Sequence, residues 1–196
     1  MMQTLLRIDS SLREEGSFSR KYGDIFIQMW KERNPGSKIN YRDLNKERIP
    51  HLTQEVTQAF FGGTQDDGVL ETSDMLCDEI RESDVLLLTC PMYNFGIPST
   101  LKSYFDHIIR VNQTFRYHGD QGYEGLLKNK KAYVITSMGG KKTDPEISEP
   151  FEQYLQQLLG FVGIEDVKMV SINGTASADF ILGQEIHYTN QVKQMI

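Results

Sequence analysis

The sequence predicts an α/β fold in which a parallel sheet has helices on both of its faces. Short apolar runs alternate with amphipathic helical segments along the chain, which is typical of parallel sheets. One of these runs, at residues 85–90, is apolar on both faces, as in a central parallel strand. A chain of 196 residues corresponds to one domain, so we expect residues 1–196 to form a single unit.

The chain begins with a predicted strand, a helix and a second strand. Residues 3–9 hold a short apolar run that ends in two serines, which indicates a buried strand. From Ser19 onwards apolar side chains recur at spacings of three and four, as in an amphipathic helix, until the breaker at residues 34–36. The apolar residues at 39–44 then predict the second strand.

The segment after the second strand has the weakest pattern in the chain. Within residues 45–72 we expect a short helix at 54–61 and a turn at Asp66-Asp67-Gly68. Either Ser73 or Asp74 is then expected to cap a helix that leads to the strand at 85–90.

The second half of the chain continues the alternation. Ser99 is expected to cap a helix, and residues 110–130 are expected to form a long loop that contains three glycines. A buried strand at 132–136 follows, and Pro150 is expected to start the next helix. The last predicted strand is 167–172.

The segment after Gly183 is expected to form a last helix, so the chain has five predicted strands in all. Five parallel strands in one domain favour a flavodoxin-like three-layer sandwich. Its five-stranded sheet has the order 2-1-3-4-5, with helices on both faces.

Charge and composition exclude several classes of function. The chain has 21 Lys and Arg against 27 Asp and Glu, a net charge of −6, so it lacks the basic footprint that nucleic acid or an anionic membrane requires. No apolar stretch approaches the roughly 20 residues that span a bilayer. Neither the two cysteines nor the four histidines are spaced as metal ligands, so we expect no metal. Two cysteines indicate reduced thiols and a cytoplasmic protein, and we expect Cys90 to be a buried core residue rather than a nucleophile.

Three polar or glycine-rich runs follow predicted strands, at residues 10–19, 91–95 and 137–140. Ligands of open parallel sheets bind beyond the carboxyl ends of the strands, so these runs are expected to converge on one site. In the first run, hydroxyls and free N–H groups before a helix predict an anion site that holds a phosphate without Lys or Arg. The alternative is that Ser17 or Ser19 only caps the helix.

The other two runs suit a flat, polar ring. Met92, Tyr93 and Phe95 offer apolar surface and Asn94 an amide, although these aromatic side chains could instead pack within their own loop. The pair Gly139-Gly140 lets the backbone approach a ligand and present N–H groups, unless it is an ordinary turn. No dinucleotide-binding or Walker A glycine motif is present.

Five stretches match one known family in sequence, order and spacing. They are Pro-Met-Tyr-Asn-Phe at 91–95 and residues 101–106, 114–117, 124–126 and 159–164. On these stretches the chain resembles the FMN-dependent NADH-azoreductases, also described as FMN-dependent NADH:quinone oxidoreductases, and residues 91–95 look like the family's flavin-contact loop. The resemblance extends from residue 3 to about residue 172.

The resemblance implies non-covalent FMN, NADH or NADPH as co-substrate, a quinone or azo compound as substrate, and a homodimer with the active site between subunits. The implied phosphate residues are Ser11, Ser17, Phe18 and Ser19. The implied ring contacts are Met92, Tyr93, Asn94 and Phe95. Ser137, Met138, Gly139 and Gly140 would close the pyrimidine end, and Tyr117 and Phe161 would line the substrate pocket.

The implied mechanism carries two electrons through the flavin, without a side chain as covalent catalyst. Asn94, Gly139 and Gly140 would stabilise developing charge. Two positions depart from the family, because Phe18 replaces a frequent Gln and Met138 replaces the Arg of some members. A basic run from Lys128 to Lys142 either attracts the phosphates of NADH or is a solvated loop. The alternative functions are a flavodoxin-type electron carrier without its own small-molecule substrate and a flavin-free binding module.

Overall fold

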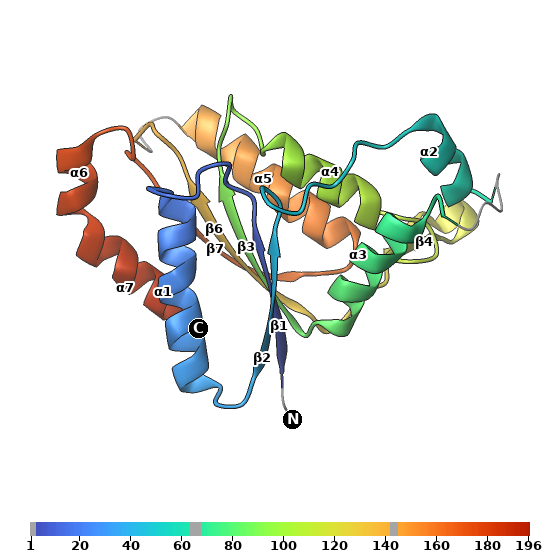
Figure 1. The fold of residues 1–196 in the computed structure, drawn as a ribbon, viewed down its shortest axis with the longest axis horizontal. Coiled ribbons are helices and arrows are strands. Elements are labelled where there is room, and N and C mark those ends of the chain that lie inside the picture. Colours follow the sequence, from blue (N-terminus) through green and yellow to red (C-terminus); the bar gives the residue numbers. More distant parts are fainter. Residues whose placement is uncertain (1–2, 63–67, 142–144) are drawn as a thin grey trace.

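A parallel sheet of five strands forms the centre of the molecule in the computed structural model, which describes residues 3–62, 68–141 and 145–196 (Figure 1). Its strand order confirms the predicted order 2-1-3-4-5. In spatial order the strands are β2 (Lys38–Asp43), β1 (Thr4–Asp9), β3 (Val85–Pro91), β6 (Lys131–Ser137) and β7 (Asp166–Ile172).

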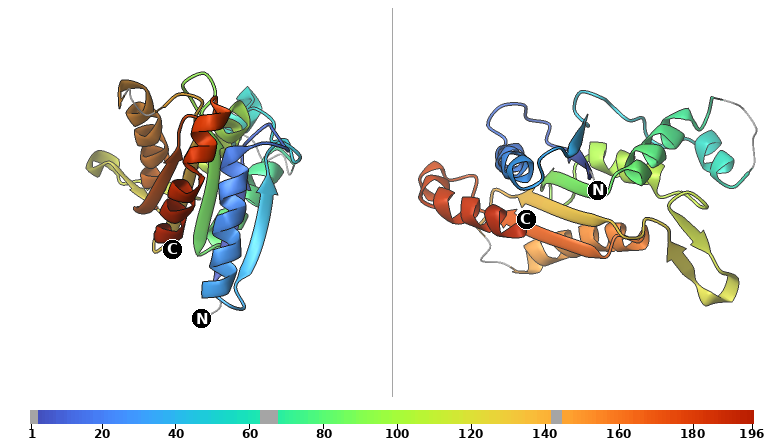
Figure 2. Two further views of the ribbon diagram at one scale, coloured as in Figure 1. Left: turned by 90° about the vertical axis from the view of Figure 1, so that its left-hand side faces the viewer. Right: turned by 90° about the horizontal axis from the view of Figure 1, so that it is seen from below.

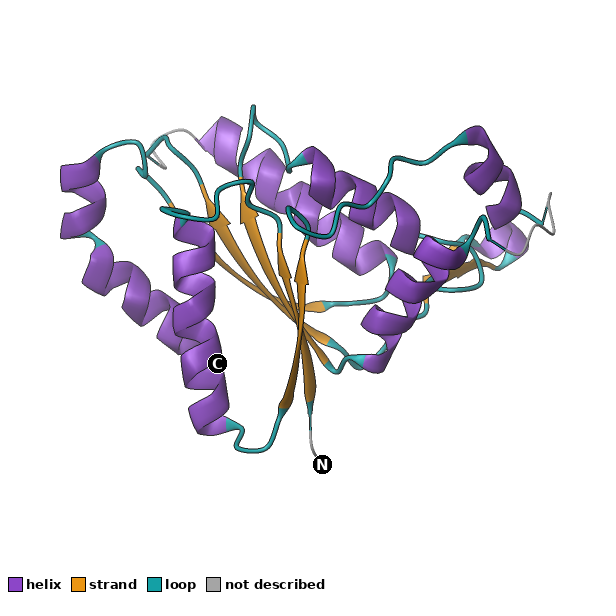
Figure 3. Cartoon of the chain, in the orientation of Figure 1, coloured by secondary structure: helices purple, strands orange, loops and turns teal. Residues whose placement is uncertain are grey.

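Helices cover both faces of this sheet, which gives the predicted three layers (Figures 1 and 3). One layer contains α1 (Phe18–Arg33), α6 (Ala178–Gly183) and α7 (Glu185–Met195). The other contains α3 (Glu71–Glu82), α4 (Ser99–Ile108) and α5 (Pro145–Phe161). None of the helices described in the structure is long and apolar enough to cross a membrane.

Two separate apolar cores hold the layers together. Side chains alternate between the faces of a strand, so Leu87 packs with α1 and α7 whereas Leu86 and Leu88 pack with the opposite helices. The central strand β3 is buried at all seven positions, as its doubly apolar pattern predicted. Tyr22 and Phe26 of α1 belong to the core that lies between the sheet and α1, at the helical spacing expected from the sequence.

The helix starts differ from the expected caps at three places. Ser73 and Asp74 lie inside α3, which begins at Glu71, and their side chains make tertiary contacts instead of capping bonds: the Ser73 hydroxyl donates to the His107 carbonyl over 2.7 Å, and Asp74 accepts from Arg110 over 2.6 Å. Ser99 is the first residue of α4 and makes no capping hydrogen bond. Helix α5 begins at Pro145 rather than at Pro150, and proline suits a first helical position because its missing N–H has no partner there.

The sequence predicted a long loop at residues 110–130. The structure differs, because this segment contains a small antiparallel hairpin of β4 (Phe115–Tyr117) and β5 (Tyr123–Gly125). Its base is fixed by a close backbone approach, since a Cβ on Gly125 would lie 2.2 Å from the nitrogen of Gly163. The hairpin therefore depends on a contact with the segment after α5. At its tip, a short 3₁₀ turn covers residues 119–121.

The predicted short helix after the second strand is confirmed as α2 (Gln54–Phe60), capped by the Thr53 hydroxyl. Asp66 and Asp67 of the expected turn lie outside the described residues. The expected C-terminal helix is α7, and α6 before it was not predicted.

Candidate functional site

The three predicted runs do meet beyond the carboxyl ends of β1, β3 and β6. They line a hollow of about 260 Å³. Eight of the predicted cofactor residues form its wall: Ser11, Ser17, Phe18, Met92, Tyr93, Ser137, Met138 and Gly139. Ser19 lies behind the wall, fully buried, with its hydroxyl 3.3 Å from that of Ser17.

A second hollow of about 300 Å³ adjoins the first, because both are lined by Met92, Met138 and Gly139. The remaining predicted residues, Asn94, Phe95 and Gly140, line this second hollow. The two hollows together have the size of a site for a small organic molecule.

Five further residues of the wall were not among the predicted cofactor contacts: Arg13, Gly16 and Pro91, which lie within the predicted runs, and Thr175 and Ala176, which lie outside them. Thr175 and Ala176 follow the carboxyl end of β7. The run Asn-Gly-Thr-Ala-Ser at 173–177 carries the same kind of polar and glycine signal as the other three runs, so the topological rule applied to the last strand would have found it.

The loop after β3 is a tight, strained turn that exposes its aromatic tip. Tyr93 and Gly96 exchange two backbone hydrogen bonds of 2.9 and 3.0 Å. Between them Asn94 and Phe95 have φ angles of 49° and 66°, and a positive φ at a bulky residue such as Phe is uncommon. Strain of this kind persists at binding sites where the surroundings impose it. Phe95 is 74% exposed, so it does not pack within its own loop.

Tyr93 connects this turn to the loop after β1. Its hydroxyl accepts a hydrogen bond from the N–H of Leu12 over 3.3 Å and lies 3.4 Å from the Ser11 hydroxyl. The Ser11 oxygen also accepts the N–H of Arg13 over 3.2 Å. These contacts hold the first two runs at a fixed separation on one side of the hollow.

The glycine loop after β6 is paired with the loop after β7. Backbone N–H groups of residues 174–176 donate to the carbonyls of Gly140, Met138 and Gly139 over 2.7, 3.1 and 3.2 Å, respectively. Among the described residues, no acceptor takes up the N–H groups of Gly139 and Gly140 themselves. The loop therefore offers two backbone donors to a ligand while its carbonyls are occupied.

The loop after β7 is in turn held by α7. The Tyr188 hydroxyl accepts the N–H of Asn173 and donates to the carbonyl of the same residue, both over 3.1 Å. Gly174 has a φ of 74°, and a Cβ there would lie 2.4 Å from the Phe180 ring, so this turn requires glycine. The C-terminal helices thus shape one wall of the hollow.

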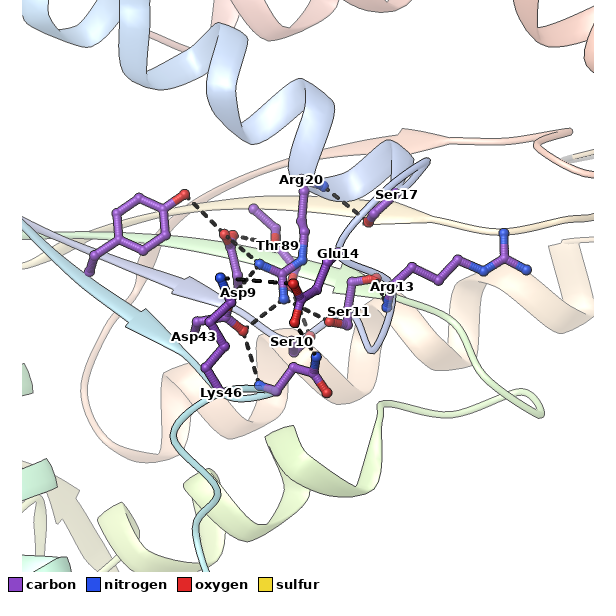
Figure 4. A network of polar contacts seen from close by, with 12 residues as sticks. Asp9, Ser10, Ser11, Arg13, Glu14, Ser17, Arg20, Asp43, Lys46 and Thr89 are labelled. Carbon is purple, nitrogen blue, oxygen red and sulfur yellow. Dashed lines mark hydrogen bonds and ion pairs between the residues drawn. The ribbon is translucent and has the colours of Figure 1, made fainter.

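A network of buried charges lies behind the loop after β1 (Figure 4). Asp9 accepts hydrogen bonds from Arg7 at 2.9 Å, Arg20 at 3.3 Å and the Thr89 hydroxyl at 2.7 Å. Arg20 also makes a bidentate pair with Asp43, with two distances of 2.7 Å. These contacts anchor the first turn of α1 to β1 and β2.

Arg20 fixes both ends of the loop that precedes α1. Its guanidinium donates to the Ser11 carbonyl over 2.7 Å, and its backbone N–H donates to the Ser17 hydroxyl over 3.4 Å. The hydrogen bond to Asp43 raises the pKa of Arg20, and Arg20 lowers the pKa of Asp43 although partial burial alone would raise it. Ser17 caps α1, as the alternative interpretation of this run proposed, and also lines the hollow.

Tyr117 and Phe161 do not line either hollow. Phe161 packs against the hairpin, with ring centroids 4.3 Å from Tyr123 and 4.8 Å from Phe115. Tyr117 is 62% exposed on β4. The hairpin lies toward one end of the long axis of the molecule and α6 toward the other (Figures 1 and 2). The loop before α6 is bonded to the glycine loop, so one chain does not bring Tyr117 and Phe161 to the glycine loop.

Most of the basic run lies at the opposite edge of the sheet. Lys130 donates to the carbonyls of Arg81 and Ser83, at the start of β3, and Lys131 pairs with Asp166 over 3.4 Å. Lys141 lines the second hollow, and Lys142 lies outside the described residues.

The remaining candidates for chemistry do not form a site. Cys90 is fully buried in the core, as expected, and this burial raises the pKa of its thiol to about 12. Among the described residues, no three His, Cys, Asp or Glu side chains gather as metal ligands would.

Comparisons with known proteins agree with the fold. A family model described as a flavodoxin-like fold matches residues 3–189. The chain is 44% identical over 180 residues to FMN-dependent NADH:quinone oxidoreductase 3 of Pseudomonas aeruginosa, covering 88% of this chain and 83% of the relative. It is 38% identical to FMN-dependent NADH:quinone oxidoreductase of Hydrogenovibrio crunogenus, covering 98% of both chains.

Solved structures share the fold. A crystal structure described as an FMN-dependent NADH-azoreductase from Bacillus anthracis in complex with FMN has a TM-score of 0.84 at 24% identity, covering 99% of both chains. An azoreductase from Bacillus anthracis str. Sterne has a TM-score of 0.85 at 24% identity, covering 98% of this chain and 96% of the other.

Proposed function

The chain belongs to the flavodoxin-like family and, within it, to the FMN-dependent NADH:quinone oxidoreductases, and we propose that it uses NADH or NADPH to reduce quinones and azo compounds through bound FMN. One observation carries the proposal. Two neighbouring hollows extend from hydroxyl and N–H donors at the start of α1 to the N–H groups of Gly139 and Gly140, which no acceptor among the described residues takes up.

The residues of the site fit FMN in their chemistry. Ser11, Ser17 and the first turn of α1 offer hydroxyl and N–H donors to a phosphate, since the first N–H groups of a helix have no intrahelical acceptor. Met92 and Tyr93 provide apolar and aromatic surface for the ring. The N–H groups of Gly139 and Gly140 suit the electronegative pyrimidine end.

When bound, FMN supplies the two-electron chemistry that links the nicotinamide to the acceptor. The chain would orient it and stabilise charge. The N–H groups of Gly139 and Gly140 would donate to the atoms on which negative charge develops, and the Asn94 amide would add a further polar contact. The strained turn at Asn94 and Phe95 would hold these groups in place before any ligand arrives. No side chain is required as a covalent catalyst.

We also propose that the active enzyme is a homodimer with its substrate pocket between subunits. Tyr117 and Phe161 lie away from the hollows of their own chain, and a second copy would be needed to bring them there. Phe61, Phe95 and Tyr117 are large and exposed, as expected for an interface. Sedimentation equilibrium tests this proposal, and a monomer at micromolar concentration that reduces quinone at full rate would refute it.

We further propose that the protein is cytoplasmic and that its chain forms one FMN-binding domain. Cys77 and Cys90 are free and buried, which supports a reducing, cytoplasmic location. The sheet uses strands from residue 4 to residue 172, and α7 packs against α1, which supports a single FMN-binding domain over residues 1–196.

An absorption spectrum of the purified protein, followed by anaerobic addition of NADH, tests the proposed function. Flavin bands at about 450 nm that bleach, together with quinone turnover on later addition, support a reductase. Flavin bands that do not bleach when NADH is added would favour a flavodoxin-type electron carrier. A colourless protein that takes up no added FMN would refute the proposal and leave a flavin-free binding module.

A further inference from the structure

Among the described residues that line the first hollow, one carries a charged side chain, the exposed residue Arg13. The other wall groups are hydroxyls, backbone and apolar side chains. A phosphate that enters this hollow approaches a chain with a net charge of −6, so a local cation has a large effect on its binding. From the sequence, the phosphate was expected to bind without Lys or Arg.

The charge of Arg13 is not used within the described part of the chain. Its backbone N–H donates to Ser11, but its guanidinium makes no hydrogen bond or ion pair there. Figure 4 shows the side chain extending away from the network of Asp9, Arg20 and Asp43. The other two arginines nearby, Arg7 and Arg20, are each paired with two carboxylates.

The acidic neighbour of Arg13 does not cancel its charge. The Glu14 carboxylate faces the other way and accepts a hydrogen bond from Asn45 over 3.3 Å. Its second oxygen lies 4.0 Å from the Lys46 ammonium. The loop thus separates these two charges, with Glu14 on the side of the network and Arg13 among the residues that line the hollow.

We propose that Arg13 binds the 5′-phosphate of the flavin and thereby makes the site select FMN over riboflavin. This inference rests on the proposed function, because it assumes that the hollow holds a flavin. An arginine fork binds phosphate through two charge-assisted hydrogen bonds, which uncharged serine donors do not supply. The nicotinamide nucleotide also carries phosphates, but Ser11, Ser17 and the start of α1 in the same wall assign Arg13 to the flavin's own phosphate.

The test measures dissociation constants of FMN and riboflavin for the apoprotein by quenching of flavin fluorescence. We expect Arg13→Gln to raise the dissociation constant of FMN by about 10- to 100-fold, as for the loss of a hydrogen bond between charged groups. The dissociation constant of riboflavin should change by less than about twofold. Arg48→Gln is the matched control, since Arg48 is exposed, carries the same charge and lies outside both hollows. It should change neither constant. High salt should reduce the difference between the dissociation constants of FMN and riboflavin, and this reduction should be larger in the wild type than in Arg13→Gln.

Two results would overturn the assignment. An equal loss for both flavins would mean that Arg13 acts only through the shape of its loop. If the variant binds both flavins as the wild type does but has a raised KM for NADH, Arg13 binds the co-substrate and not the flavin phosphate. A wild-type chain that binds neither flavin would instead refute the proposed function itself, and the role of Arg13 with it.

Discussion

The buried carboxylate Asp9 offers a sharp test of how charge is organised behind the site. Arg7 contacts two carboxylates, Asp9 at 2.9 Å and Asp24 at 2.6 Å. The two pairs differ in burial, because Asp9 is 1% exposed and Asp24 is 69% exposed, while Arg7 itself is 2% exposed. We predict that Asp9→Asn strongly destabilises the fold and that Asp24→Asn does not.

The magnitude follows from this difference in exposure. Removal of one partner from a buried ion pair costs about 3–5 kcal/mol, because the remaining charge stays buried. Arg7 keeps Asp24 in the variant, so the lower end, about 3 kcal/mol, applies to Asp9→Asn. For a protein of this size that corresponds to a drop in Tm of roughly 6–12 °C. The exposed pair contributes less than about 1 kcal/mol.

Urea unfolding followed by circular dichroism measures both variants at pH 7, with Tm from calorimetry as a second readout. Equal losses in the two variants, or a loss below about 1 kcal/mol for Asp9→Asn, would contradict the reasoning that burial decides the strength of this pair.

Three further predictions concern the site and its surroundings. Gly140→Val should fold normally, since a Cβ there meets no atom within 4 Å, but should purify with little FMN, whereas Gly160→Ala, an equally open position outside the site, should keep full occupancy in the absorption spectrum. Cys90 should resist a thiol reagent at pH 8 until urea unfolds the chain, because burial raises its pKa to about 12, and rapid labelling of the native protein would contradict its core position. Partial burial alone would raise the pKa of Asp43, but Arg20 lowers it, so the stabilising contribution of this carboxylate is present above about pH 4 and lost as pH falls further. Asp43→Asn should therefore flatten the loss of stability between pH 5 and pH 3, and an unchanged slope would show that the pair does not act on folding.

The sequence predicted the strands because each carries a short cluster of apolar residues, and β3 has the longest continuous apolar run among them. The polar loops converge for a general reason, since carboxyl ends of parallel strands share one edge. The run at 91–95 was therefore placed correctly, although the positive φ angle at Phe95 has no local sequence signal, because Phe rarely adopts this conformation.

The features that were missed depend on contacts between distant segments. The hairpin of β4 and β5 has strands of three residues and rests on the approach of Gly125 to Gly163, which no local pattern reveals. Thr175 enters the site because its N–H pairs with the carbonyl of Met138, a register that only the folded sheet defines. Arg13 resembles a solvated loop charge in sequence, and only its place in the wall of the hollow distinguishes it from Glu14.

The pairing of the loop after β7 with the glycine loop has a consequence for the order in which the protein is made. The wall of the hollow draws on residues from Ser11 to Ala176, and Tyr188 supports the last of them. Synthesis proceeds from the N-terminus, so the loop after β1 is made first and waits for its opposite wall. A nascent chain can complete the site only after α7 has left the ribosome, which places loading with cofactor after the synthesis of every element from β1 to α7.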